Sequence, residues 1–124
     1  MNIGKLSVTT NHWRIQFYFP GPDFRYNGTF ISIDGSEIDQ YLKAYLDNWN
    51  TFIKLKELVS NTGGEMTKVG EQNMSIRAGG FFEGVCIRHH YLPVSTKEQL
   101  EKVIADLKWA KKRANEVMNL LNQI

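Results

Sequence analysis

The chain alternates apolar and polar side chains early, in a pattern typical of a half-buried β-strand. In residues 13–19, WRIQFYF, large apolar side chains occupy every second position, and a period of two places them on one face of a strand. Further along, Asn27-Gly28 lies between aromatic and β-branched residues. This dipeptide favours a two-residue hairpin because both turn positions tolerate positive φ. An antiparallel sheet is therefore expected to begin here.

After Asp34-Gly35 the apolar period becomes helical. Ser36 is a suitable N-cap. From Ile38 to Val59, apolar residues recur at helical spacing, with most charged residues on the other side. The pattern predicts an amphipathic helix over residues 37–59, ended by the Asn61-Thr62-Gly63-Gly64 segment.

Strand patterns return over residues 65–92. Residues 74–77 and 85–91 alternate apolar and polar side chains, with Gly79-Gly80 as the expected turn between them and Pro93 at the end. With the final helix described below, the order is strands, helix, strands, helix. We expect an α+β fold in which one antiparallel sheet of four to five strands carries two long helices. A length of 124 residues suits a single domain over residues 1–124.

The last segment carries the most regular apolar pattern. Ser95 and Glu98 match a capping box that opens a helix running almost to the C-terminus. Its apolar stripe has unbroken three-four spacing and consists of Leu100, Val103, Leu107, Ala110, Ala114, Val117, Leu121 and Ile124. The stripe could pack on the chain's own sheet or pair with a second copy. We favour the second interpretation, a homodimer.

Composition limits the classes of function. The chain has 15 basic and 13 acidic residues and a net charge of +2, a balance that disfavours general electrostatic binding to nucleic acid or membranes. One cysteine cannot form an intrachain disulfide, and neither a signal-like N-terminus nor an apolar run of membrane-spanning length occurs. A soluble cytoplasmic protein is expected.

Candidate catalytic and metal sites are weak. Cys86 and His90 lie four residues apart in a predicted strand, about 13 Å along it, which is beyond hydrogen-bond reach. His12 could supply a base instead, but a cysteine between valine and isoleucine is typical of a small buried hydrophobe. Adjacent His89 and His90 point to opposite strand faces, and no metal-ligand or phosphate-loop motif occurs. We expect no enzyme activity, no metal and no cofactor.

Cations at alternating positions suggest an anion-binding surface. Arg14, Arg77, Arg88 and His90 each lie on one face of a predicted strand, and if those faces coincide they would form a floor suited to an anion. An ordinary solvated sheet face is the alternative.

Aromatic residues accompany cations at two further places. In the final helix, Trp109 and Arg113 are four residues apart with Lys112 beside them, a group that could stack on a nucleobase and neutralise phosphate, or could be a solvated flank. Phe81 and Phe82 follow two glycines, so at least one ring is expected near a turn, either exposed for stacking or capping the turn.

Three segments carry a resemblance to a known family: YNGTFISIDGSEIDQYLKAYLDNWNTFIKLKEL, FFEGVCIRHHYLPVST and DLKWAKKRANEV. With its length and element order, the chain resembles the phage and prophage anti-Thoeris proteins of the "sponge" type. The resemblance implies a non-catalytic anti-defence protein in the host cell cytoplasm. Such a protein binds and sequesters the cyclic ADP-ribose isomer made by a TIR-domain enzyme, which prevents activation of the Thoeris effector.

The resemblance also implies a site. Family members form dimers, some assemble further, and the ligand lies at the protomer interface between stacking aromatic residues and basic residues of the last helix. Phe82 in GGFFEG and Arg113 in KKRANE occupy suitable places. The family helix tends to offer two arginines, whereas here Arg113 lies among lysines with Trp109 one turn earlier, so the second phosphate contact is in doubt.

Two other classes of function fit parts of the sequence. A small protein-binding inhibitor, such as an anti-CRISPR or immunity-type protein, would use the basic C-terminal helix against an acidic partner. A nucleic-acid module would require more phosphate contacts than the small net charge of +2 favours. The ligand-binding candidates are Phe82, Arg113, Trp109, Lys112, Arg88, His90 and Arg77.

Overall fold

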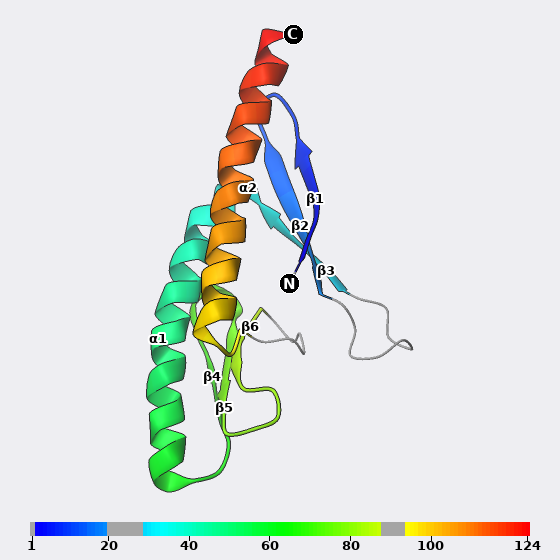
Figure 1. The fold of residues 1–124 in the computed structure, drawn as a ribbon. Helices are drawn as coiled ribbons and strands as arrows, with labels where there is room; N and C mark the ends of the chain where they lie inside the picture. Colours follow the sequence, from blue (N-terminus) through cyan, green and yellow to red (C-terminus); the bar gives the residue numbers. More distant parts are fainter. Residues whose placement is uncertain (1, 20–28, 88–93) are drawn as a thin grey trace. The chain divides into compact units, whose positions relative to one another are not determined.

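The structure is a computed structural model that describes residues 2–19, 29–87 and 94–124 (Figure 1). The chain divides into two compact units. Residues 1–39 and 103–124 form the first unit, and residues 40–102 form the second. Because both helices continue across a unit boundary, each unit combines a small sheet with helical residues. The single domain over residues 1–124 stays a prediction.

The first unit contains a three-stranded antiparallel sheet in the order β1-β2-β3. Its strands are β1 (Asn2–Val8), β2 (Trp13–Phe19) and β3 (Thr29–Asp34). Ile15 pairs with Ile33 and Phe17 with Ile31, and all four side chains are buried. The part of helix α2 (Lys97–Gln123) that belongs to this unit runs along the sheet (Figure 1). The alternation predicted for residues 13–19 therefore marks a true buried face.

The second unit contains a second three-stranded antiparallel sheet, in the order β4-β5-β6. Its strands are β4 (Met66–Val69), β5 (Ser75–Ala78) and β6 (Gly84–Cys86). Nearly all of helix α1 (Ile38–Thr62) belongs to this unit. Val94 extends the sheet by a single antiparallel bridge to Val85.

The predicted α+β class and the order of strands and helices are confirmed, but the single sheet of four to five strands is wrong. Two sheets of three strands form instead. Within the described residues, every ladder joins strands that are neighbours in the chain. Side-chain alternation indicates which face of a strand is buried, but it carries no information about which strand lies beside it. The sequence pattern could not separate one sheet from two.

Two predicted helix starts are displaced by local hydrogen bonding. Asp34, rather than Ser36, caps the first helical turn, a 3₁₀ turn at Gly35–Glu37, because its carboxylate accepts the Ser36 N–H. At α2 the reciprocal pair is Thr96 with Gln99, one residue beyond the predicted Ser95–Glu98 box. The Asn27-Gly28 hairpin turn lies outside the described residues.

The apolar stripe of α2 is largely used inside the chain. Leu100, Val103, Leu107, Ala110 and Ala114 are all buried. Only the end of the stripe reaches solvent, with Ile124 fully exposed. Packing within the chain thus accounts for the stripe as far as Ala114. The homodimer stays a prediction that another surface would have to support. Over the described ranges, neither helix is long and apolar enough to cross a membrane.

One buried amide fastens the β4–β5 connection to α1. The Asn48 side chain donates to the Glu71 carbonyl (3.0 Å) and accepts the Glu71 N–H (2.9 Å). The same connection holds Gln72 and Asn73 at a φ of 55°, a left-handed conformation that non-glycine residues seldom adopt. Gly70 packs so closely that a Cβ there would collide with the Asn48 side chain. Asn48 therefore stabilises a strained turn.

Replacing Asn48 with alanine is expected to lower the free energy of unfolding by about 1–3 kcal/mol, because the substitution removes two part-buried hydrogen bonds and leaves the Glu71 N–H without its partner. Urea denaturation followed by circular dichroism measures the change. Asn50→Ala is the matched control, since Asn50 is exposed on the same helix and its loss should change stability by less than about 0.5 kcal/mol. Equal effects of the two substitutions would contradict the assignment.

Candidate functional site

The second unit carries an open pocket at one end of its sheet. It has a volume of about 190 Å³ and is lined by Glu65, Met66, Thr67, Arg77, Ala78, Gly80, Phe81 and Phe82. The lining combines one cation, one carboxylate, two phenylalanines and a threonine hydroxyl. Such a pocket suits a flat ring that carries a nearby negative charge.

Strand register places Arg77 in this pocket. Arg77 lies opposite Thr67 of β4 on one side and Gly84 of β6 on the other, and residues directly opposite in a ladder share one face of the sheet. Because Gly84 has no side chain, it leaves space beside the Arg77 side chain. No hydrogen bond or ion pair to another residue within the described ranges engages the Arg77 guanidinium, which leaves its five N–H donors for an anion.

A glycine turn presents the two phenylalanines. Gly79 has a φ of +88°, and a Cβ at that position would collide with the Gly64 carbonyl. Only glycine fits there without displacing the backbone. The turn leaves Phe81 fully exposed and Phe82 46% exposed, and both rings line the pocket. Phe82 is therefore half exposed at the pocket, and its role in stacking stays a prediction.

Glu83 fixes that turn. Its Oε2 accepts the Gly79 N–H (3.1 Å), and its Oε1 lies 3.3 Å from Lys56 Nζ of α1. The hydrogen bond from Gly79, together with the Lys56 ammonium, lowers the pKa of the Glu83 carboxyl. The carboxylate thus stays charged at neutral pH and links the phenylalanine turn to the helix.

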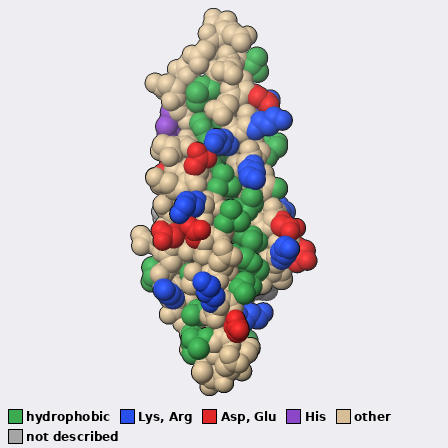
Figure 2. All heavy atoms as spheres, turned by 90° about the vertical axis from the view of Figure 1, so that its left-hand side faces the viewer, with side chains coloured by type: hydrophobic (Ala, Val, Ile, Leu, Met, Phe, Trp, Pro, Cys, Tyr) green, Lys and Arg blue, Asp and Glu red, His purple; other side chains and the backbone are tan. Residues whose placement is uncertain are grey.

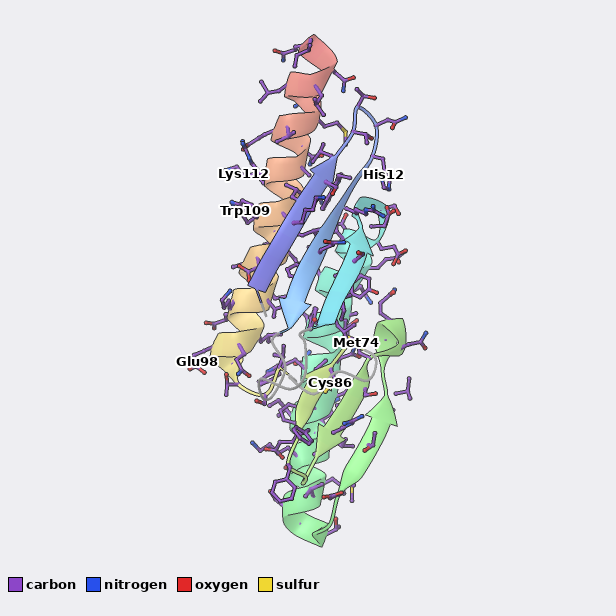
Figure 3. All side chains as sticks on the ribbon, turned by 90° about the vertical axis from the view of Figure 1, so that its right-hand side faces the viewer. His12, Met74, Cys86, Glu98, Trp109 and Lys112 are labelled. Atoms are coloured by element: carbon purple, nitrogen blue, oxygen red, sulfur yellow. The ribbon has the colours of Figure 1, made fainter. Side chains whose placement is uncertain are left out.

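The basic group predicted on the last helix lies on α2 in the first unit. Trp109 is 49% exposed, and its side chain and that of Lys112 extend from the same side of the helix (Figure 3). Arg113 Nη1 lies 3.4 Å from Glu116 Oε2, and both side chains are about half exposed. An exposed ion pair of this kind contributes little to stability, so the Arg113 guanidinium can exchange Glu116 for another anion.

The predicted site residues thus divide into three groups. Phe82 and Arg77 line one pocket of the second unit. Trp109, Lys112 and Arg113 lie together on α2 in the first unit. Arg88 and His90 lie outside the described residues. The predicted anion-binding surface, with its cations on one sheet, does not form. Arg14 lies on β2 of the first sheet and Arg77 on β5 of the second.

The cysteine has the surroundings of a core residue. Cys86 is buried in β6, and its burial raises the pKa of the thiol, so the reactive thiolate is disfavoured. His12, the base considered for it, belongs to the first unit and is bound to Asp34 there. The described part of the chain contains no group of three histidine, cysteine or acidic side chains placed to hold a metal ion.

Sequence reasoning missed the other pocket residues and one polar cluster. Thr67 could be recognised only from its register opposite Arg77. Glu83 follows the two phenylalanines, but its bond to Gly79 needs the folded turn. The cluster joins His12 Nε2 to Asp34 Oδ2 at 2.6 Å, while the Ser36 hydroxyl donates to Asp34 Oδ1 at 2.9 Å. His12 and Asp34 are 22 residues apart, so no local motif indicates their contact.

Comparison of the chain with protein-family models, with curated proteins and with solved structures found no match. The resemblance to the anti-Thoeris sponges therefore stays a prediction that depends on the three segments quoted above and on the placement of Phe82 and Arg113.

The Asp34 cluster predicts a measurable acid titration. The Ser36 N–H, the His12 ring and the Ser36 hydroxyl lower the pKa of the Asp34 carboxyl from 3.8 to about 2. Because the folded pKa is depressed, the stabilisation is complete above the unfolded pKa and is lost as pH falls from about 4 towards 2. A carboxyl-carbon NMR titration should give a midpoint near 2 for Asp34, and His12→Ala should raise it. An unchanged midpoint near 3.8 in the native chain would disprove the cluster.

Proposed function

We propose that the protein binds and sequesters, without chemical change, a small nucleotide of the cyclic ADP-ribose type. The observation that carries the proposal is the pocket in which the Arg77 guanidinium, with no described partner, lies beside Phe81 and Phe82. Such a nucleotide offers what this lining can recognise, a purine ring and a diphosphate. The anti-Thoeris resemblance supports the same ligand class.

Each part of the ligand has a suitable contact. A purine can stack on the Phe82 ring, and stacking of a base on an aromatic side chain contributes about 1–3 kcal/mol. The Arg77 guanidinium can donate two parallel hydrogen bonds to phosphate oxygens, while Thr67 adds a hydroxyl. The lining contains no paired acid and base in contact with one another, so binding is the chemistry that these side chains favour.

The size of the pocket indicates that one copy is not enough. Pockets that enclose a small ligand usually measure about 300–1,000 Å³, whereas this one measures about 190 Å³. That volume suits a nucleobase but not a base with two phosphates and a second ribose. We therefore propose that the protein acts as a homodimer, or as a higher assembly of dimers, in which further contacts cover the ligand.

The biological role follows from the resemblance. A phage or prophage protein that retains the signal in the host cytoplasm would keep it from the Thoeris effector, which would remain inactive. Sequestration requires tight retention and a high copy number but no turnover. A small fold built around a binding pocket is sufficient for this role.

The outer side of α2 favours one alternative, a small protein-binding inhibitor. An exposed Trp109 flanked by Lys112 and Arg113 has the composition of a binding hot spot, and an acidic partner surface would complement it. This alternative requires no bound nucleotide. A retention experiment therefore separates the two functions.

The purified protein, mixed with the product of an activated Thoeris TIR enzyme and separated from free ligand, should release that molecule intact after heat denaturation. Mass spectrometry of the released fraction measures the result. A cleaved product would show that the protein is an enzyme. Absence of any retained molecule would favour the protein-binding inhibitor.

Single substitutions should locate the ligand. Arg77→Ala and Phe82→Ala are each expected to raise the Kd of the retained nucleotide by about tenfold or more in calorimetry, because a charge-assisted hydrogen bond or a stacked ring is lost. Arg113→Ala tests the α2 group in the same way. The matched control is Lys68→Ala: Lys68 is an exposed cation on β4, paired with Ile76 on the face opposite to Arg77. Full affinity in the Arg77 and Phe82 variants would place the ligand elsewhere.

A further inference from the structure

The pocket of the second unit carries a charged side chain that the contacts proposed above do not use. Glu65, the residue before β4, lines the pocket together with Arg77 of β5. Its side chain lies beside the glycine turn, since a Cβ at Gly80 would stand 3.1 Å from Glu65 Oε1. Because Gly80 has no side chain, the Glu65 carboxylate has room at the pocket.

The two opposite charges of the pocket do not pair with each other. Among the described residues, no ion pair or hydrogen bond engages the Glu65 carboxylate or the Arg77 guanidinium. Exposed side chains do pair elsewhere in the same unit, as Lys43 and Asp47 do at 2.9 Å, and the side of the molecule that carries α1 shows acidic and basic groups beside each other (Figure 2). The pocket thus keeps one acceptor group and one donor group for a ligand.

The two groups require different chemistry of that ligand. The Arg77 guanidinium has only hydrogen-bond donors, and the ionised Glu65 carboxylate has only acceptors. Inorganic phosphate would satisfy the guanidinium but would be repelled by the carboxylate. A base without phosphate would leave the guanidinium without an anion. A nucleotide carries both an anion and several donors, so it can satisfy both groups at once.

The order of the parts in a nucleotide indicates which donors meet Glu65. The ribose adjoins both the base and the phosphates, so a ligand that stacks on Phe82 and binds Arg77 brings its ribose into the same pocket of about 190 Å³. A carboxylate is a suitable acceptor for ribose hydroxyls, and an acidic residue has this role in dinucleotide-binding folds. The exocyclic amine of adenine is the other available donor, but it lies at the end of the base that is remote from the phosphates.

We propose that Glu65 determines the sugar specificity of the pocket: its carboxylate accepts hydrogen bonds from the ribose hydroxyls, and the pocket thereby selects ribonucleotides over deoxyribonucleotides. The inference rests on the proposed function, since it needs a nucleotide whose phosphates bind Arg77. Stacking and phosphate binding cannot supply this preference, because the base and the phosphates are the same in both kinds of nucleotide. The carboxylate also disfavours a ligand with a phosphate on its ribose, because like charges would then meet.

Calorimetry with ADP and 2′,3′-dideoxy-ADP tests the inference, because the two ligands differ only in the ribose hydroxyls. The native protein is expected to bind ADP about tenfold more tightly, since the dideoxy ligand leaves the carboxylate without its donors. Glu65→Ala should reduce the ratio of the two Kd values to about one. A purely structural role of Glu65 would weaken both ligands equally and leave the ratio unchanged. That result would overturn the inference.

Two controls define what the carboxylate contacts. Glu57→Ala should keep the native ratio, because Glu57 is exposed on α1 and is not part of the pocket lining. Inosine diphosphate lacks the exocyclic amine but keeps both hydroxyls, so the native protein should bind it about as tightly as ADP. A preference for ADP over inosine diphosphate that disappears in Glu65→Ala would place the carboxylate at the base and would disprove the ribose contact.

The outcomes separate this inference from the proposed function. A native chain that retains the product of the TIR enzyme, but binds ADP no better than the dideoxy ligand or does not bind ADP, overturns the inference and leaves the proposed function intact. Absence of binding with both ADP and the TIR-enzyme product overturns the proposed function and the inference with it.

Discussion

The architecture of the second unit depends on the two hydrogen bonds between the buried Asn48 amide and the Glu71 backbone. They hold the connection between β4 and β5 against α1, although that connection contains two non-glycine residues with positive φ. With the connection fixed, the register that sets Thr67 opposite Arg77 is fixed too. A slip of one residue would turn Arg77 to the other face of the sheet, and the cation would leave the pocket.

A second constraint acts at the opposite end of β5. The close approach of Gly79 to the Gly64 carbonyl admits no side chain, and Glu83 ties the same turn to Lys56. Thus α1 contacts the segments at both ends of the β5 strand, one through the Asn48 amide and one through the Lys56 ammonium. The pocket lies beside the Gly79 turn, where Arg77 is half-buried and the phenylalanines are exposed. This combination suits a site that selects an anion by fixed hydrogen bonds and a ring by stacking.

The sequence allowed the elements to be predicted better than their assembly. Helix and strand periods gave α1, α2 and β2 within a few residues, because burial of one side imposes those periods. The glycines before Phe81 and Phe82 also indicated an exposed ring. The sequence did not predict which strands pair with each other, because every strand offers the same backbone N–H and C=O groups along its edges. For the same reason the sequence suggested one cationic floor, whereas Arg14 and Arg77 belong to different sheets.

The apolar positions of α2 and α1 show how a regular pattern can mislead about its partner. The α2 stripe is the more regular, yet small residues such as Ala110 and Ala114 let that helix pack closely inside the chain, where they are fully buried. On α1 polar residues interrupt the apolar ones, and Leu46 and Ile53 remain exposed. A pattern records that a face is apolar, and only the fold determines which apolar face is already covered.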